Sequence, residues 1–239
     1  MTNISIIVPI LNEAEQLPDL LQHLQHWQNR GSEIILVDGA SSDHSLSLME
    51  KSAFTVLHSQ RGRARQMNAG AEFSKGSILL FLHADTRLPI NADERVLHAL
   101  SKAKQQEPAT GKNVWGRFNV CIRADEASTI EKMMFKVISW FINKRSRLSG
   151  IATGDQAIFV TRITFQMIGG FVEQPLMEDI ELSRMLKKIA LPICLTEKVT
   201  TSARRWQNKG LWRTIWLMWC LRFAYWRGVS AEELAQRYR

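Results

Sequence analysis

The chain has 239 residues, of which 45% are hydrophobic, enough for one large α/β domain with a full core and too many for a mainly disordered chain. Its first residues lack the basic start and long apolar core of a secretory signal, so we expect a cytoplasmic protein. The three cysteines are scattered among apolar residues, which argues against a disulfide framework or a zinc site.

The formal net charge of +8 is concentrated near the end of the chain. Residues 198–239 hold nine Lys or Arg and two Glu, a net charge of +7, and five of the eight tryptophans. Basic segments suit nucleic acid, an anionic membrane surface or phosphate-bearing substrates. The added tryptophans favour the membrane interface, so we expect no nucleic-acid partner.

The first half of the chain alternates apolar runs with segments of helical periodicity. Strands are expected over 4–10, 33–37, 54–58 and 78–82, and helices from Asn12 to Gly31, after a cap at Ser41, Ser42 or Asp43, and over 63–74. This order predicts an α/β fold with a mostly parallel central sheet and helices on both faces.

The second half is less regular. Helices are expected over 91–105 and 128–143 and from residue 177, and strands over 115–122, 159–161 and 191–195. We find no internal repeat, low-complexity segment or flexible linker.

The last predicted helix carries one aromatic stripe, because its large aromatic residues alternate steps of four and three: Trp212, Trp216, Trp219, Phe223 and Trp226. Arg222 follows only eight uncharged positions, which argues against a membrane-spanning helix. Three locations remain open for the stripe: against its own domain, against a second subunit, or at a membrane interface.

Two carboxylates follow apolar strands, and in open α/β sheets ligands bind at the carboxyl ends of the strands. Asp38 precedes Gly39, which would let a ligand approach closely, although Asp38 could equally be a turn residue that caps the next helix, a role that Asp43 fits better. Asp85 ends the run from Leu79 and suits a divalent cation or a phosphate, the alternative being a simple turn. His83 could ligate the same ion or only form a hydrogen bond.

Two further clusters contain charged residues at expected helix starts. Arg61, Arg63 and Arg65 suit a diphosphate, the alternative being a solvated basic face. Glu178 and Asp179 would be favoured by the helix dipole in any case, but one can act as a general base while the other orients it.

Taken in order, seven motifs resemble those of family 2 glycosyltransferases with the GT-A fold (a Rossmann-like nucleotide-diphospho-sugar transferase fold), over about the first 206 residues. They are Ile7-Val-Pro-Ile-Leu-Asn-Glu13, Val37-Asp-Gly-Ala-Ser-Ser-Asp43, Gly62 to Gly70, Leu82-His-Ala-Asp85, Gly154-Asp-Gln156, Glu178-Asp179 and Arg204-Arg-Trp206. The whole chain, with its tail, is also similar to a small bacterial subgroup of this family. The resemblance divides the chain into a glycosyltransferase domain, 1–206, and a basic, Trp-rich helical extension, 207–239.

The resemblance implies roles for individual residues. Those that would hold the nucleotide are Pro9, Glu13, Asp38 and Arg63. Asp85 would stand at the last acid of the Asp-x-Asp motif and bind Mn²⁺ or Mg²⁺, with His83 where the paired acid is often found. Asp179 would deprotonate the acceptor, with Glu178 beside it.

Four more residues would lie along the donor and acceptor channel: Gly154, Asp155, Arg205 and Trp206. The last two end a Gln-x-x-Arg-Trp motif that is typical of polymer-making members. Its Gln is absent here, where Ser202 begins the segment Ser-Ala-Arg-Arg-Trp, which favours transfer of a single sugar.

The expected function is metal-dependent, inverting transfer of a sugar from a nucleotide-diphosphate sugar to an acceptor hydroxyl, which could be lipid-linked. Peripheral contact with the inner face of the membrane through 211–227 and a homodimer are both compatible with the sequence. The alternatives are a nucleotidyltransferase and a sugar-nucleotide-binding protein without activity. A nucleotidyltransferase usually carries a Gly-rich basic loop after its first strand, where Pro9 to Glu13 stand here.

Overall fold

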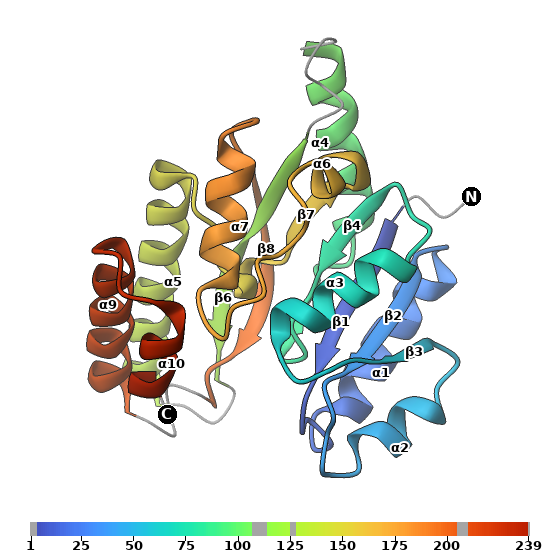
Figure 1. The fold of residues 1–239 in the computed structure, drawn as a ribbon, viewed down its shortest axis with the longest axis horizontal. Helices are drawn as coiled ribbons and strands as arrows, with labels where there is room; N and C mark the ends of the chain where they lie inside the picture. The colour runs from blue at the N-terminus through green and yellow to red at the C-terminus, as the bar shows by residue number, and fades with distance from the viewer. Residues whose placement is uncertain (1–3, 107–113, 125–127, 205–209, 239) are drawn as a thin grey trace.

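The computed structural model describes residues 4–106, 114–124, 128–204 and 210–238 (Figure 1). The elements of its first half are β1 (Ile4–Ile10), α1 (Leu17–Asn29), β2 (Glu33–Asp38), α2 (Ser45–Glu50), β3 (Thr55–His58), α3 (Arg63–Phe73), β4 (Ile78–Phe81), β5 (Thr86–Arg87) and α4 (Ala92–Gln106). Those of its second half are β6 (Trp115–Arg123), α5 (Thr129–Ser149), a 3₁₀ turn (Gly154–Gln156), β7 (Ile158–Thr161), α6 (Arg162–Met167), α7 (Glu178–Lys187), β8 (Ile193–Ser202), α9 (Leu211–Trp226) and α10 (Ala231–Tyr238).

Within the described residues the strands form one sheet in the order β3-β2-β1-β4-β7-β6-β8-β5. The first four strands of this order are parallel, as the sequence predicts. The other half is mixed, because β7 runs antiparallel to both β4 and β6, and β5 antiparallel to β8, while β6 and β8 are parallel. The regular strand and helix alternation that produces parallel neighbours stops after β4, and the parallel pattern stops with it.

Helices cover both faces of this sheet, as expected. Leu24 and Trp27 of α1 and Val96 of α4 pack on one face, while Met67 of α3 and Leu182 of α7 pack on the other. Because each face is buried, β1 and β2 are apolar almost throughout rather than alternating.

Two helix boundaries differ from the expected ones. Helix α1 begins at Leu17 rather than near Asn12, because Asn12 has a left-handed backbone (φ 55°) and the carbonyl of Glu13 closes a turn with Gln16. Helix α5 extends beyond residue 143 to Ser149, between a capping box at its start and Gly150, whose φ of 68° ends it.

Helices α9 and α10 pack on the start of α7. Leu221 of α9 and Leu234 of α10 are buried against Met177, the residue before α7. The hydroxyl of Tyr225 donates to the carboxylate of Glu181 in α7 (3.0 Å). One side of α9 therefore contacts α7, while its aromatic stripe is exposed, Trp216 by 74%.

Candidate functional site

The loops after β1 and β2 hold each other in place at the carboxyl edge of the sheet. The side-chain oxygen of Asn12 accepts from the backbone N–H of Ser42 (2.8 Å), and the backbone N–H of Glu13 donates to the hydroxyl of Ser45 (2.8 Å). The chain passes from β1 to β2 and β3 on one side and to β4 on the other, so this edge is the topological switch point where ligands bind.

Asp38 is the buried last residue of β2, and its carboxylate accepts hydrogen bonds from the loop that follows it. The backbone N–H groups of Ala40 and Ser41 donate to it at 3.1 and 3.2 Å. The turn role considered for Asp38 is thus present, while Asp43 accepts from the N–H of Ser45, the first residue of α2 (2.9 Å). The nucleotide role of Asp38 stays a prediction.

Gln66 is a residue that the sequence analysis missed. Its buried side-chain amide donates to the carbonyls of Ile10 (2.8 Å) and Val37 (2.7 Å), so it joins the ends of β1 and β2 from α3. A Cβ atom at residue 39 would meet the Gln66 amide at 2.8 Å, so a larger residue there would displace this amide from the two carbonyls. A glutamine on the otherwise apolar face of a predicted helix is the signal that could have revealed it.

Four non-glycine residues of the described chain have left-handed backbones: Asn12 (φ 55°), Ala40 (φ 63°), Ala157 (φ 46°) and Met177 (φ 65°). Each lies within three residues of a candidate site residue, in a loop at the edge of the sheet. Such strain persists only where the surroundings impose it and is common at functional sites.

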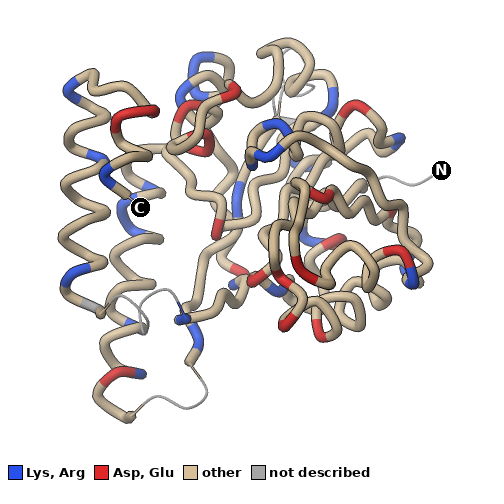
Figure 2. The backbone as a smooth tube through the Cα atoms, turned by 60° about the horizontal axis from the view of Figure 1, so that its bottom comes forward, with Lys and Arg blue, Asp and Glu red and all other residues tan. Residues whose placement is uncertain are grey.

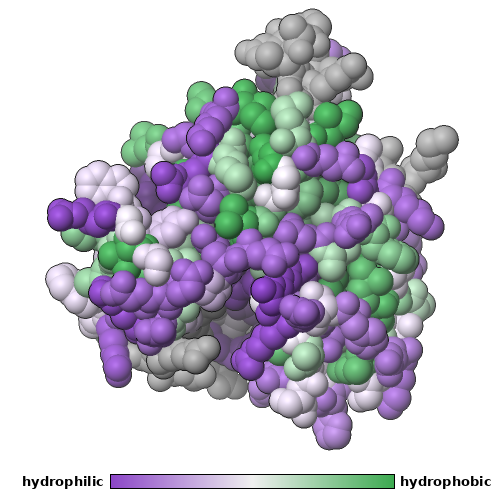
Figure 3. All heavy atoms as spheres, viewed as in Figure 1, coloured by the Kyte–Doolittle hydropathy of each residue, from purple (hydrophilic) through white to green (hydrophobic). Residues whose placement is uncertain are grey.

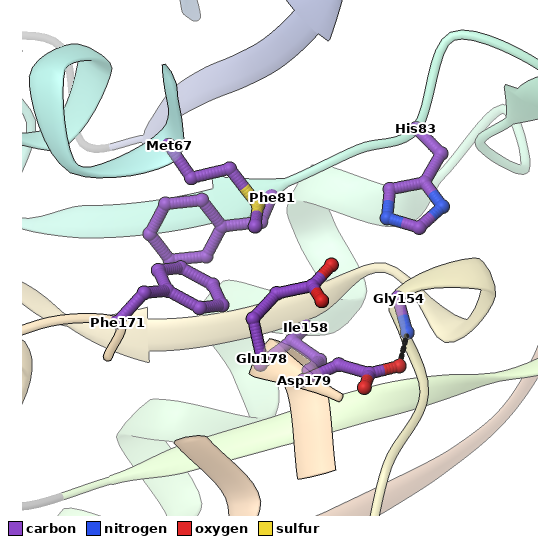
Figure 4. Close-up of a pocket in the computed structure, with 8 residues that line it drawn as sticks. All are labelled: Met67, Phe81, His83, Gly154, Ile158, Phe171, Glu178 and Asp179. Atoms are coloured by element: carbon purple, nitrogen blue, oxygen red, sulfur yellow. Dashed lines mark hydrogen bonds between the residues drawn. The ribbon is translucent and has the colours of Figure 1, made fainter. Parts of the chain in front are cut away.

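A small pocket lies beyond the end of β4 (Figure 4). Met67, Phe81 and Phe171 form its apolar end, and His83 and Gly154 its opposite end. The carboxylate of Glu178 points into the space between them. The predicted acid pair is therefore placed beside the residues that follow β4.

Asp179 has the properties of a general base. One of its carboxylate oxygens accepts from the N–H of Gly154 (2.8 Å) and the other from the N–H of Ile180 (2.7 Å). Burial and the charge of Glu178 raise the pKa of Asp179 to about 6, against the opposing effect of these N–H groups and of Arg63. A carboxylate with this pKa is ionised near neutral pH yet more basic than an exposed one.

Arg63 pairs with Glu178 rather than standing free for a ligand. Its guanidinium lies 3.0 Å from the buried Glu178 carboxylate. Burial acts to lower the pKa of Arg63, but the ion pair with Glu178 outweighs it and raises the pKa. Since Arg63 begins α3 and Glu178 begins α7, the pair joins the two helices that flank the pocket; the expected nucleotide role of Arg63 remains a prediction.

The other arginines of the same segment do not converge on one point. Arg65 pairs with Glu173 at 2.9 Å, and Arg61 is exposed on the loop before α3. A diphosphate site made by all three arginines is therefore not assembled in this structure.

His83, Asp85 and Asp155 form a cluster in which one ligand atom from each lies within 4.8 Å of the others. The His83 Nδ1 and a carboxylate oxygen of Asp155 are 3.2 Å apart. One imidazole nitrogen and two carboxylates are a suitable donor set for Mn²⁺, and the two carboxylates also suit Mg²⁺. The structure brings Asp155 to this cluster, and its expected place along the sugar channel stays a prediction.

Gly154 allows this cluster to form. A Cβ atom at residue 154 would lie 2.2 Å from the His83 ring, closer than any real contact. Because its N–H also binds Asp179, Gly154 couples the candidate base to the candidate metal site.

The remaining predicted residues lie in and after β1 or outside the described residues. Pro9 is buried in β1 opposite Val37. Glu13 pairs with Arg204 at 3.3 Å, and burial raises the pKa of Glu13, with Asp85 adding to the effect and Arg204 opposing it. Arg205 and Trp206 lie outside the described residues.

Arg145 is a second residue that the sequence analysis missed. It projects from α5, and its Nη2 is buried without a hydrogen-bond partner among the described residues. Burial lowers the pKa of Arg145, while the nearby Asp179 carboxylate opposes the shift. No sequence signal distinguishes it from the other basic residues of α5.

The surface is hollowed between the half with β1 to β3 and the half with α7 and α10, and hydrophilic side chains border the hollow (Figure 3). Among the helices that the structure describes, we find no segment whose length and hydropathy suit a membrane span.

The fold is the GT-A fold that the motifs lead us to expect. The structure resembles S. aureus TarS 1-349 in complex with UDP-GlcNAc, with a TM-score of 0.63 and 16% identity over 84% of this chain and 58% of that one. It also resembles the mannosyltransferase PcManGT of Pyrobaculum calidifontis in complex with GDP-Man and Mn²⁺, with a TM-score of 0.59 and 20% identity over 93% and 61% of the two chains. Both likenesses confirm the expected fold.

Residues 5–110 match the family model described as glycosyl transferase family 2. The resemblance that the motifs indicate is thus confirmed over these residues. It is 29% identical over 120 residues to an undecaprenyl-phosphate 4-deoxy-4-formamido-L-arabinose transferase of Pseudomonas savastanoi pv. phaseolicola, covering 45% of this chain and 34% of the relative. A protein of the same name from Pseudomonas fluorescens is 33% identical over 97 residues, covering 36% and 28%. The chain spans about a third of the length of these relatives.

Proposed function

We propose that this protein transfers a single sugar, with inversion, from a nucleotide-diphosphate sugar to an acceptor hydroxyl. The observation that carries the proposal is the convergence of Asp179, the Arg63–Glu178 pair and the His83–Asp85–Asp155 cluster beyond β4. The family match and the nucleotide-sugar ligands named for the similar structures support it.

The nucleotide would lie on the loops after β1 and β2. The backbone N–H of Glu13 donates to the hydroxyl of Ser45, and that of Ala40 to the carboxylate of Asp38, so both loops are held in one conformation. The parallel half of the sheet would thus hold the donor, and the mixed half, through the residues around Gly154 and Asp179, would present the acceptor.

His83, Asp85 and Asp155 would hold a divalent cation, Mn²⁺ or Mg²⁺. When bound, such an ion neutralises charge that develops on the leaving diphosphate. The fit rests on the spacing of the three ligand atoms and on Gly154, which leaves room for the His83 ring.

Asp179 would take the proton of the acceptor hydroxyl as the oxygen attacks the anomeric carbon. The two N–H groups on its carboxylate fix its orientation, and Glu178 raises its basicity. Attack from the face opposite the diphosphate inverts the anomeric centre in one displacement and needs no covalent enzyme intermediate. Glu178, held in place by its ion pair with Arg63, acts as a positioning residue.

The acceptor would be lipid-linked, as the names of the undecaprenyl-phosphate transferases suggest by analogy. If the attacking group were a phosphate oxygen, which is ionised at neutral pH, Asp179 would not be needed as a base. The Asp179 variant described below separates a hydroxyl from a phosphate acceptor.

The first experiment is thermal stabilisation of the purified chain by UDP, GDP, CDP and dTDP, each with and without Mn²⁺. We expect a metal-dependent shift with one of them that Asp85→Ala and Asp155→Ala abolish. The exposed Glu50 at the end of α2 offers a matched control, since Glu50→Ala removes a carboxylate outside the cluster. No shift with any diphosphate contradicts the proposal.

Two further assays address the alternatives. A nucleotidyltransferase would release pyrophosphate from a nucleoside triphosphate and a sugar phosphate. A protein without activity would show the nucleotide shift but release no nucleoside diphosphate from any donor in the presence of lipid extract.

A further inference from the structure

The aromatic stripe of α9 is a surface that the transfer chemistry does not use. Its members are exposed by 60 to 78%: Trp212, Trp216, Trp219, Phe223 and Trp226. The opposite side of the helix is buried through Thr214 and Leu221. Because the buried side of α9 packs on the rest of the chain, the aromatic stripe faces outward and stays exposed.

Helix α5 presents a second apolar stripe, which the sequence did not single out. Its members are exposed by 48 to 77% and recur at helical spacing: Ile130, Met133, Val137, Trp140, Phe141 and Leu148. The other side of α5 packs on β6 through Phe135 and Ser139. Two helices of this chain thus each leave one large apolar face exposed.

The two stripes belong to the same end of the molecule. Figure 1 shows α5 and α9 next to each other at the left, with their axes roughly parallel, and both remain at the left in the view of Figure 2. Each stripe holds five or six large exposed apolar residues, whereas an ordinary soluble surface exposes such residues singly.

Both stripes carry positive charge. Exposed basic residues flank or interrupt the stripe of α5 (Lys132, Lys136, Lys144 and Arg147) and flank that of α9 (Arg213 and Arg227). Acidic residues are scarce, since the sequence of α5 has only Glu131 and that of α9 has none. Blue segments along both helices in Figure 2 mark this distribution.

From this arrangement we propose that α5 and α9 together form a docking face for an anionic lipid bilayer. Tryptophan has an apolar ring and a polar N–H and is favoured at the level of the lipid headgroups, while Lys and Arg bind anionic lipids. A second copy of this chain fits less well, because it would bring two basic faces together. This proposal rests on the proposed function in one respect, because the docking face would give the site access to a lipid-linked acceptor.

The docking face is connected to the acid pair. Leu221 of α9 packs against Met177, and Tyr225 binds Glu181, so α9 contacts α7 at two points close to Asp179. A bilayer held by α9 would therefore lie at a fixed orientation to the pocket. The site would be held near lipid headgroups without any helix crossing the membrane.

The test is binding of the full chain to neutral phosphatidylcholine vesicles and to vesicles that also contain phosphatidylglycerol, by flotation at low and high salt. We expect binding to the anionic vesicles only, weakened by salt. The double variants Trp216→Ser/Trp219→Ser and Trp140→Ser/Phe141→Ser should each lose at least about tenfold in partitioning. Lys136→Gln should lose about fivefold.

Ile90→Ser/Leu191→Ser is the matched control, because both residues are apolar and exposed (78% and 77%) but lie outside α5 and α9. It should bind as the parent chain does. The proposal is overturned if the chain binds neutral and anionic vesicles equally, or if either stripe variant binds vesicles as the parent chain does. It is also overturned if the chain binds no vesicle and light scattering shows a dimer that is absent in the stripe variants.

Nucleotide-dependent thermal shifts on the same variants separate this proposal from the proposed function. A chain that shows the shift but binds no vesicle overturns the docking face alone. A chain that binds anionic vesicles but shows no shift with any nucleotide overturns the transferase proposal alone.

Discussion

The pH dependence of transfer offers a demanding test of Asp179, because the structure sets both its midpoint and the direction in which two neighbours move it. With a pKa of about 6, the Asp179 carboxylate is about nine tenths ionised near pH 7 and about one tenth ionised near pH 5. If ionised Asp179 is the base, kcat/KM should fall about tenfold over this range.

Two substitutions should move this midpoint in opposite directions. Arg63 lowers the pKa of Asp179, so Arg63→Gln should raise the midpoint and make the enzyme lose activity at a higher pH. Glu178 raises that pKa and also occupies Arg63, so Glu178→Gln should lower the midpoint. A merely structural role for either residue would reduce activity without moving the profile.

The assay measures release of nucleoside diphosphate under initial-rate conditions from about pH 5 to about pH 8, with the metal ion saturating throughout. Asp179→Asn should lose on the order of 10² to 10⁴ in rate and the acid limb of the profile. Near-normal transfer by Asp179→Asn would refute the assignment of Asp179 as the base. It would also indicate an acceptor that is already ionised, such as a phosphate.

Three further variants test how the site is built. Gly154→Ala should push the His83 ring away, since the new Cβ would lie 2.2 Å from it. Mn²⁺ affinity measured by calorimetry should then fall by tenfold or more. The overpacking should also lower the free energy of unfolding by about 1 to 3 kcal/mol. Gln66→Leu should lower the free energy of unfolding in urea by about 1 to 3 kcal/mol, because the carbonyls of Ile10 and Val37 each lose one buried donor, although the Gly39 N–H still donates to Ile10. Tyr225→Phe should cost about 1 kcal/mol and increase hydrogen exchange in α9, because α9 loses its hydrogen bond to α7.

Each of these three has a result that would contradict it. Unchanged Mn²⁺ affinity in Gly154→Ala would place the metal away from His83. A Gln66→Leu chain as stable as the parent, with exposed Gln25→Leu as the control, would mean that other groups satisfy those carbonyls. Unaltered exchange in Tyr225→Phe would mean that apolar packing alone holds α9.

Much of the fold follows from local pattern. The apolar runs of β1, β2 and β4 and the helical spacing of α1, α3 and α9 predict these elements within a few residues, because periodicity and capping act over one or two turns. The start of α1 is the exception, since contacts with the loop after β2 hold Asn12 in a left-handed conformation. The mixed order of the second half of the sheet could not be predicted, because no single segment specifies which neighbour it pairs with.

The candidate site likewise has features that the sequence predicts and features that depend on the tertiary structure. The sequence by itself determined which carboxylates end strands and begin helices, and so pointed to Asp38, Asp85 and Asp179. Only the tertiary structure decided that Asp155 would approach His83, 72 residues away, and that Arg63 would pair with Glu178, 115 residues away. Residue type and local spacing are properties of a segment, whereas proximity depends on how crossovers and packing bring distant segments to one edge of the sheet.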